Sequence, residues 1–367
     1  MPEQAEFGRF FLPGPTEVLP RVLQAQAQAM IGHRGKGMEE LLAGLQPGLR
    51  SVFQTERPVY LSTSSATGLM EGAVRNGAVR RVLSLTNGAF SERFAAISRA
   101  NGLETTALAV EWGEANAPET LAAALGSGDY DAVTVVHSET STGVLNPVRE
   151  LASVAHATGG GDVVILVDAV SSAAGTELRA DAWELDFVLT GSQKALALPP
   201  GLAFGVANER VLKRAEQKAN RGIYFDFLEF EKGVRKDQTP NTPAVSLFYA
   251  LREQLQVMAE EGIERRWARH AAMAGTVYGW VEHMRGRGVE LGILAPAGFR
   301  SPTVTCVTLP APLSGPAVNK AMKERGYTIA TGYGKLKEGS IRIGHMGEHT
   351  VAETERLLGV LEEVLRA

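Results

Sequence analysis

Residues 163–194, VVILVDAVSSAAGTELRADAWELDFVLTGSQK, contain the pattern that decides the fold of this chain. An apolar run, Val163–Asp168, ends on an acid, and a second run, Phe187–Thr190, is followed closely by Lys194. Runs that are apolar on both faces and rich in β-branched residues are typical of central strands in a parallel sheet. Lys194 follows Asp168 by 26 residues, which leaves room for a helix and a return strand. The spacing therefore predicts that Asp168 and Lys194 stand at the ends of neighbouring strands.

Short apolar runs alternate with helical stretches outward from this segment, over residues 58–207. The other predicted strands are Val59–Ser62, Arg81–Leu85, Glu104–Ala109, Ala132–His137 and Leu202–Ala207, and the predicted helices are Gly68–Ala78, Ser91–Ala100, Pro118–Leu125 and Pro147–Ala157. This alternation predicts an α/β fold with a mostly parallel, open sheet. Ligands of such sheets bind outside the carboxyl ends of the strands, so residues that follow strands are the candidates for chemistry.

The length of the chain, 367 residues, exceeds what one hydrophobic core of about 250–300 residues supports. Long helical patterns run from Pro243 to Glu282, and the later sequence predicts strands at Thr303–Thr308 and Ser340–Ile343 with helices at Gly315–Arg325 and from Thr350. We therefore expect an N-terminal segment at residues 1–20, a large α/β domain at 21–260 and a small α+β domain at 261–367.

The composition excludes several classes of protein. A hydrophobic content of 44% is that of a globular protein and excludes intrinsic disorder. The balance of 37 basic and 41 acidic residues gives no electrostatic footprint for nucleic acid or an anionic membrane. The sequence starts with acids and a proline instead of a signal peptide, and its single cysteine fits a reducing compartment. The histidines show no metal-ligand spacing. We expect a cytoplasmic protein without a metal site.

Four features follow the predicted strands. The stretch Ser65-Ala66-Thr67 leads into a helix, whose N-terminus can bind phosphate or can simply be capped by Ser65. Phe90 can stack on a flat ring, although core packing is the commoner role. Asp168 is costly to bury without a cation, and a partly desolvated Lys194 is nucleophilic. Together they match pyridoxal 5′-phosphate (PLP), whose aldehyde forms a Schiff base with lysine and whose pyridine nitrogen an acid keeps protonated.

Ordered sequence blocks extend this match over nearly the whole chain. They are Pro13-Gly14-Pro15-Thr16, Gly32-His33-Arg34, Ser65-Ala66-Thr67-Gly68, Glu139-Thr140-Ser141-Thr142-Gly143, Val167-Asp168-Ala169-Val170-Ser171-Ser172, Gly191-Ser192-Gln193-Lys194-Ala195-Leu196, Pro199-Pro200-Gly201, Thr239-Pro240-Asn241-Thr242-Pro243 and Ile341-Arg342-Ile343-Gly344. With them the chain resembles the class V aminotransferases of PLP fold type I, especially the alanine/serine–glyoxylate (serine–pyruvate) group. That resemblance implies a large PLP-binding α/β domain and a smaller C-terminal α+β domain.

The resemblance also implies roles for individual residues. Lys194 is expected to be the Schiff-base lysine and proton shuttle, and Asp168 the partner of the pyridine nitrogen. The other implied cofactor contacts are Ser65, Ala66 and Thr67 at the phosphate with Gln193 nearby, Phe90 stacked on the ring and Thr140 near the phenolic oxygen. Thr239, or a neighbour in the TPNTP segment, is expected to reach a phosphate across a homodimer interface. Arg342 is expected to bind the α-carboxylate of the substrate as a bidentate fork.

The substrate is less closely defined. His33 and Arg34 match basic residues that bind phosphoserine in a related branch, or they shape the dimer interface or the active-site wall. We expect alanine or serine as amino donor with glyoxylate or pyruvate, and keep phosphoserine with 2-oxoglutarate as the alternative. A Ser-Lys amide hydrolase built on Ser192 and Lys194 would leave Asp168 and Arg342 without roles. A non-enzymatic scaffold would not need the Lys and Asp pair.

Overall fold

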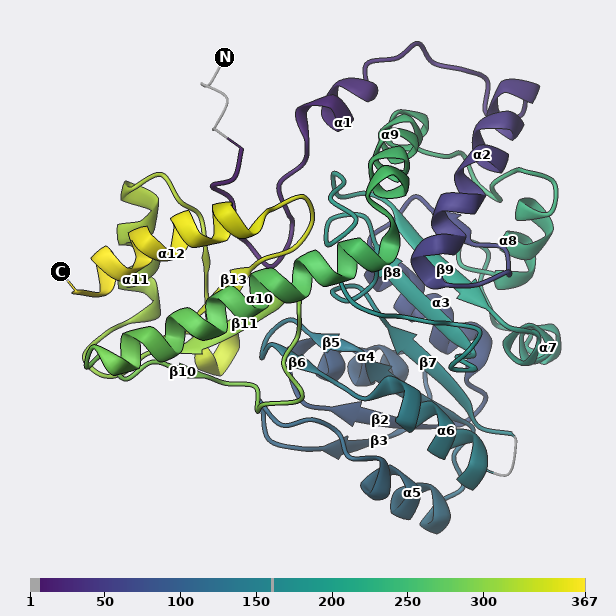
Figure 1. Cartoon of the computed structure of the whole chain (residues 1–367). Coiled ribbons are helices and arrows are strands. Elements are labelled where there is room, and N and C mark those ends of the chain that lie inside the picture. Colours follow the sequence, from purple (N-terminus) through teal and green to yellow (C-terminus); the bar gives the residue numbers. More distant parts are fainter. Residues whose placement is uncertain (1–6, 160–161, 367) are drawn as a thin grey trace.

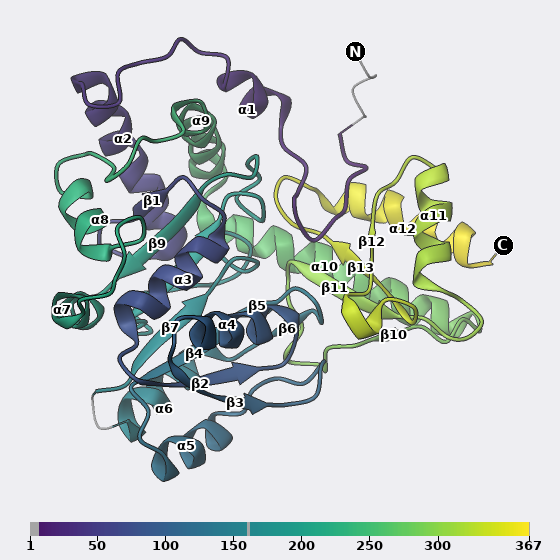
Figure 2. The ribbon, with the colours of Figure 1, turned by 180° about the vertical axis from the view of Figure 1, so that it is seen from behind.

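The computed structural model describes residues 7–159 and 162–366, so the first six residues of the predicted N-terminal segment lie outside it. A seven-stranded sheet forms the centre of the larger region, and a four-stranded sheet forms the centre of the smaller region (Figures 1 and 2). The large sheet runs in the order β1 (Tyr60–Ser62), β9 (Ala203–Ala207), β8 (Phe187–Gly191), β7 (Val164–Asp168), β4 (Ala132–Val136), β2 (Arg81–Thr86), β3 (Glu104–Ala109). Strand β9 alone runs antiparallel to its neighbours, which confirms the predicted mostly parallel α/β sheet.

Helices cover both faces of this sheet, because its central strands are apolar on both sides. In β7, Ile165 and Val167 belong to the core on one face, whereas Val164 and Leu166 belong to the core on the other. The first face is covered by α2 (Lys36–Phe53), α5 (Pro118–Ser127), α6 (Val148–Thr158) and α9 (Val245–Glu261), and the second by α3 (Ala66–Gly77), α4 (Ala89–Ala100), α7 (Glu209–Gln217) and α8 (Phe227–Val234). Helices α2, α7 and α8 lie outside the predicted helices.

The interval between Asp168 and Lys194, which leaves room for a helix, contains none in the described structure. Residues 169–186 form successive turns instead, although β7 and β8 do pair in parallel. Ala174 has φ +67°, in the left-handed region, which ends any helical run at that point. Gly175 is packed so tightly that a Cβ would lie 2.3 Å from Thr303 Cγ2. The segment is therefore shaped by close packing against the smaller region.

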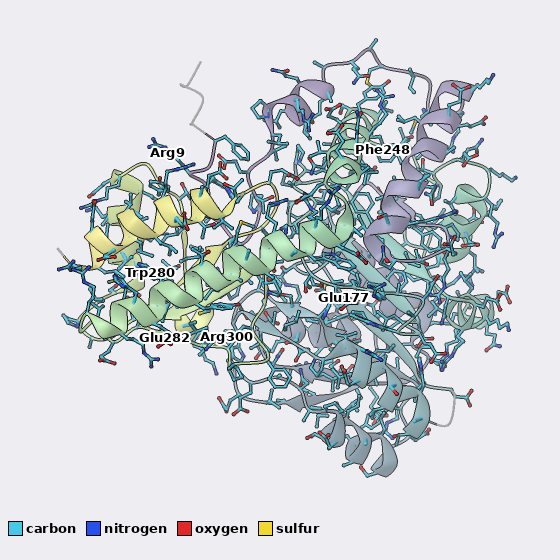
Figure 3. The ribbon with its side chains drawn as sticks, in the orientation of Figure 1. Arg9, Glu177, Phe248, Trp280, Glu282 and Arg300 are labelled. Carbon is cyan, nitrogen blue, oxygen red and sulfur yellow. The ribbon has the colours of Figure 1, made fainter. Side chains whose placement is uncertain are left out.

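The smaller region has its own sheet and core. Its antiparallel strands run in the order β10 (Gly292–Ile293), β11 (Val304–Thr308), β13 (Ser340–Gly344), β12 (Ala330–Thr331), and α11 (Gly315–Glu324) and α12 (Val351–Arg366) pack beside them. The long helix α10 (Ile263–Gly286) spans both regions (Figure 1). Phe248 on α9 belongs to the large core and Trp280 on α10 to the small one (Figure 3).

The remaining elements are short: α1 (Pro20–Ala25), the hairpin of β5 (Ser138–Glu139) with β6 (Val144–Leu145), and the 3₁₀ turn η1 (Gly334–Leu336). Within the described residues, no helix has both the length and the apolar character needed to cross a bilayer.

Candidate active site

A cavity of about 80 Å³ lies where β7 and β8 end, at the edge of the sheet that the sequence predicts for ligands. Asp168 is the last residue of β7, and Lys194 follows the end of β8. The residues around the cavity include most of those expected at the cofactor: Ser65, Ala66, Thr67, Phe90, Thr140, Asp168, Gln193 and Lys194. The structure therefore brings together side chains that lie up to 129 positions apart in the sequence.

Asp168 is a buried carboxylate with spare hydrogen-bonding capacity. It is 3% exposed, and its Oδ1 accepts a hydrogen bond from the backbone N–H of Val170 at 2.8 Å. Burial raises the pKa of Asp168 to about 7, and the charge of Glu139 adds to this rise, whereas the Val170 N–H, Lys194 and Arg93 oppose it. A cationic ring nitrogen at this position would give the carboxylate the partner that it lacks.

Lys194 is held in a tight space beside the N-terminal segment. Its Nζ donates a hydrogen bond to the Pro13 carbonyl oxygen and lies 5.9 Å from the centre of the Phe90 ring. A Cβ on Gly14, whose φ is +120°, would lie 2.5 Å from Nζ, so this position needs glycine. Burial lowers the pKa of Lys194 to about 8, with a further lowering by Arg342. A larger share of the neutral, nucleophilic amine is then present near neutral pH.

The N-terminus of α3 forms one end of the cavity. The helix starts at Ala66, and its N-cap residue Ser65 makes no side-chain capping bond, which leaves the first N–H groups for an anion. Gln193 lines the same cavity, and a Cβ on Gly191 would lie 2.7 Å from its Oε1. This arrangement suits a phosphate group bound by Ala66, Thr67 and Gln193.

Phe90 is fixed through its backbone by Glu139, a residue that sequence reasoning did not assign to the site. The fully buried Glu139 carboxylate accepts hydrogen bonds from the Phe90 N–H at 3.1 Å and the Ser91 N–H at 2.9 Å. Ser141 Oγ donates to the same carboxylate at 2.6 Å. A carboxylate at the N-terminus of α4 is favoured by the helix dipole. Its place in the ETSTG block, directly before Thr140, could have indicated that Glu139 belongs to the site.

Arg342 reaches the site from β13 of the smaller sheet. Its Nε donates to the Thr331 carbonyl oxygen at 3.0 Å and its Nη1 to the Thr140 carbonyl oxygen at 3.1 Å. The guanidinium carbon lies 5.3 Å from the centre of the Tyr333 ring, which in turn lies 5.6 Å from the Phe90 ring. Burial lowers the pKa of Arg342. These contacts hold the guanidinium beside Thr140, which lines the cavity.

Two further side chains of the site were not predicted. Tyr333 lies between Phe90 and Arg342, and Arg93 lies with its guanidinium carbon 5.0 Å from the Phe90 ring centre and lines the cavity. Arg93 is one helical turn beyond Phe90, so the helical period could have indicated it. Tyr333 lies in a loop of the smaller region, and no sequence pattern predicts that this loop packs near Phe90.

The structure does not bring Thr239, His33 and Arg34 into this cavity within one chain. Arg34 donates from Nη1 to the Thr239 carbonyl oxygen at 2.7 Å and from Nη2 to the Pro240 carbonyl oxygen at 3.2 Å. The Thr239 hydroxyl donates to the Asn241 carbonyl oxygen at 2.7 Å. His33 is partly exposed. The two segments, far apart in the sequence, thus contact each other next to the start of α2, where Arg34 is exposed and Thr239 is buried.

The residues present fit PLP: an amine for the aldehyde, an under-satisfied buried acid for the ring nitrogen, an aromatic ring to stack on it and an uncapped helix start for the phosphate. The fold and the cavity define a PLP-dependent enzyme of fold type I, and the comparisons agree.

Residues 76–337 match the family model described as aminotransferase class-V, and the chain belongs to that family. It is 39% identical to an uncharacterized aminotransferase of Methanocaldococcus jannaschii, over 97% of this chain and 92% of the relative. It is 32% identical to serine–glyoxylate aminotransferase of Methylorubrum extorquens, over 92% of this chain and 86% of the relative. The crystal structure of alanine–glyoxylate aminotransferase from Nostoc superposes with a TM-score of 0.92 at 28% identity, covering 100% of this chain and 97% of that one. The chain is therefore a PLP-dependent aminotransferase.

Proposed function

We propose that this aminotransferase takes its amino group from a small amino acid, alanine or serine, and passes it to glyoxylate or pyruvate. The observation that carries the proposal is the packing around Arg342, where Tyr333 stands 5.3 Å from the guanidinium and close to Phe90. An aromatic wall beside the carboxylate-binding group favours a short substrate side chain. The similarity to serine–glyoxylate and alanine–glyoxylate aminotransferases supports the same choice.

PLP, when bound, supplies an electron sink for the bond broken at the amino acid Cα. The Lys194 amine would hold the cofactor, then take the proton from Cα and return it to the former aldehyde carbon. Asp168 would keep the ring nitrogen protonated, and Arg342 would orient the substrate through its α-carboxylate. Phe90 would fix the plane of the ring, while Ala66, Thr67 and Gln193 hold the phosphate and Thr140 contacts the ring oxygen.

We further propose a cytoplasmic homodimer with an active site at each interface. The contact between Arg34 and the Thr239 segment supports this, because both residues are expected at an active site yet lie outside the cavity of their own chain. The side chains of Ile223 and Tyr224, 85% and 40% exposed, lie in a neighbouring segment of the same region. In this arrangement Thr239 would reach the partner's phosphate, and His33 and Arg34 would line the partner's site.

A half-reaction screen tests the choice of donor. The cofactor-loaded enzyme is mixed separately with alanine, serine, aspartate, glutamate and phosphoserine, and the loss of the visible absorbance of lysine-bound cofactor is followed. We expect alanine or serine to react fastest. Reaction with phosphoserine and glutamate alone would assign the enzyme to the alternative, phosphoserine with 2-oxoglutarate. The variant Arg342→Gln is expected to lose reaction with every donor, because the carboxylate contact is common to all of them.

A further inference from the structure

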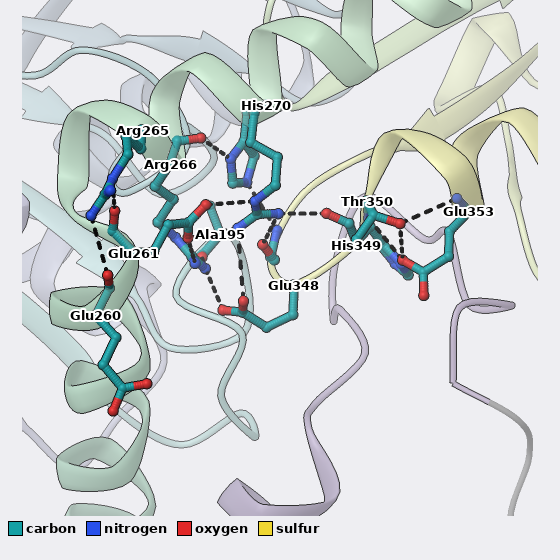
Figure 4. Close-up of polar contacts among 12 residues, drawn as sticks. Ala195, Glu260, Glu261, Arg265, Arg266, His270, Glu348, His349, Thr350 and Glu353 are labelled. Carbon is teal, nitrogen blue, oxygen red and sulfur yellow. Dashed lines mark hydrogen bonds and ion pairs between the residues drawn. The ribbon is translucent and has the colours of Figure 1, made fainter.

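A cluster of buried charges lies at the junction of α9 and α10, outside the cofactor cavity, and contacts the turn that carries Lys194 (Figure 4). Its centre is Arg266, which is fully buried. Arg266 Nη2 donates to the Ala195 carbonyl oxygen at 2.7 Å and to Glu348 Oε1 at 2.7 Å. Its Nη1 donates to Glu261 Oε2 at 2.9 Å. One guanidinium therefore joins the residue after Lys194 to two carboxylates.

The turn that carries Lys194 has a backbone that needs support from outside. Ala197 has φ +51°, a left-handed conformation that is costly for a residue with a Cβ. Its N–H donates to the Lys194 carbonyl oxygen at 2.7 Å, and Thr16 Oγ1 donates to the same oxygen at 3.0 Å. Such a conformation persists only when the surrounding structure fixes it. Arg266 provides one of these external contacts at Ala195.

The other end of the cluster holds the loop that follows β13, the strand of Arg342. Glu348 lies in this loop, and Arg269 Nη1 donates to the Gly347 carbonyl oxygen at 3.1 Å. The Gly347 N–H donates to His270 Nε2 at 3.1 Å. A Cβ on Gly347 would lie 3.2 Å from the Ala197 Cβ, so the loop packs directly on the Lys194 turn. The cluster thus connects the segments that carry Lys194 and Arg342.

A buried ion pair is seldom the most stable way to fill a core, because desolvation offsets much of the attraction. A guanidinium, however, offers donors in fixed directions, which suits a backbone carbonyl and a carboxylate at the same time. We propose that Arg266, paired with Glu348, is a positioning residue for transamination: it fixes the Lys194 turn relative to the strand of Arg342. The Lys194 amine is then held where it can reach the Cα of a substrate that Arg342 binds.

The test compares four holoenzyme variants with the wild type. Arg266→Lys keeps the positive charge but loses the guanidinium donors that point in fixed directions. Glu348→Gln keeps a hydrogen-bond acceptor but loses the negative charge. The double variant Arg266→Met/Glu348→Leu replaces the pair by apolar side chains, which preserves folding where a single change does not. Arg265→Lys is the matched control, because Arg265 is exposed and, among the described residues, its hydrogen bonds go to the helix carbonyls of Glu260 and Glu261 (Figure 4).

Four quantities are measured: the thermal midpoint of unfolding, the pH midpoint of the visible absorbance of lysine-bound cofactor, the single-turnover rate with the amino donor, and the dissociation constant for that donor. For Arg266→Lys and the double variant we expect the rate to fall about tenfold or more, since a small misplacement of a reacting group is costly. We expect the absorbance midpoint to move by about half a pH unit, and donor affinity to change by about twofold at most. Glu348→Gln should show smaller changes of the same kind, and Arg265→Lys should show none.

A folded Arg266→Lys or double variant with wild-type rate and absorbance midpoint would overturn the proposal. The proposal would also be overturned if the single-turnover rate fell only in variants whose thermal midpoint is lowered, and recovered in the double variant. That result would show that Arg266 has a merely structural role. The proposal rests on Lys194 as the cofactor-bound residue, which has its own test: Lys194→Ala should lack the visible absorbance. If that variant keeps it, the assignment of Lys194 fails, independently of Arg266.

Discussion

Two buried carboxylates, Asp168 and Glu139, lie beside the same cavity and differ in what surrounds them. Glu139 is fully buried and accepts hydrogen bonds from the N–H groups of Phe90 and Ser91, and from both the N–H and the hydroxyl of Ser141. Asp168 accepts one backbone hydrogen bond, from Val170, and burial raises its pKa to about 7. The satisfied carboxylate holds the fold of the site together, whereas the under-satisfied one is available to a ligand.

The largest effect is expected from Asp168→Asn. The half-reaction with an amino donor should slow by about 100-fold or more, because a preorganised charge at the reacting centre is lost. The fold should be retained, since the amide oxygen still accepts from Val170. Stopped-flow absorbance gives the rate, and a rate within about tenfold of the wild type would contradict the role of Asp168.

The same variant changes how the stability of the cofactor-free protein depends on pH. Asp168 has a folded-state pKa of about 7, above its ordinary value of 3.8, so the folded protein binds the extra proton between these values. This carboxyl therefore stabilises the fold at low pH, and its contribution is lost as the pH rises toward 7. Thermal unfolding at pH 5 and pH 8 should show a smaller difference for Asp168→Asn than for the wild type.

Glu139→Gln should produce the opposite balance, a loss of stability with a smaller loss of rate. We expect the free energy of unfolding to fall by about 2 kcal/mol, because hydrogen bonds to a buried charge are removed. The rate of the half-reaction should fall about tenfold, because Phe90 shifts from its stacking position on the cofactor ring. Glu150→Gln is the control, since Glu150 is exposed in the first turn of α6. Chemical denaturation measures the stability, and an unchanged midpoint would contradict the structural role of Glu139.

Asp168 and Glu139 also differ in how strongly each affects the pKa of Lys194. Its pKa is lowered to about 8 by burial and by Arg342, while Asp168 and, to a smaller extent, Glu139 raise it. The rate of cofactor capture by the cofactor-free protein should rise with pH and level off above about 8, because only the neutral amine reacts. Asp168→Asn should lower this midpoint more than Glu139→Gln does, and Arg342→Gln should raise it. An equal shift in both carboxylate variants would contradict the order of their effects.

The smallest effect is expected from Ser141→Ala. Ser141 Oγ donates to Glu139 at 2.6 Å and accepts from the Ala89 N–H at 3.0 Å, at the start of α4. Its loss should lower the free energy of unfolding by about 1 kcal/mol, with the activity retained. Ser127→Ala, at an exposed helix end, serves as the control. A change in rate larger than the change in stability would show that Ser141 acts on the cofactor directly.

The sequence predicted the parts of the site that lie at the ends of strands. Asp168 and Lys194 follow apolar runs whose β structure is specified by their own side chains, and the parallel pairing of β7 with β8 brings them together. The connection between them had room for a helix but forms turns, because the left-handed Ala174 and the tight packing of Gly175 depend on the smaller region. Tyr333 and Glu139 were not predicted as site residues, since their roles come from neighbours far away in the sequence.

By itself, the sequence determined the alternating α/β framework, the ordered family blocks and the chemistry of a lysine, an acid and an arginine. Local apolar patterns and strand-end chemistry are properties of short segments, so one chain suffices to read them. Only the tertiary structure decided which of two buried carboxylates has fewer hydrogen bonds, how Arg342 of the smaller sheet contacts Thr140 beside the cavity, and how Arg266 contacts the Lys194 turn. These facts depend on burial and on contacts between distant segments, which no local pattern encodes.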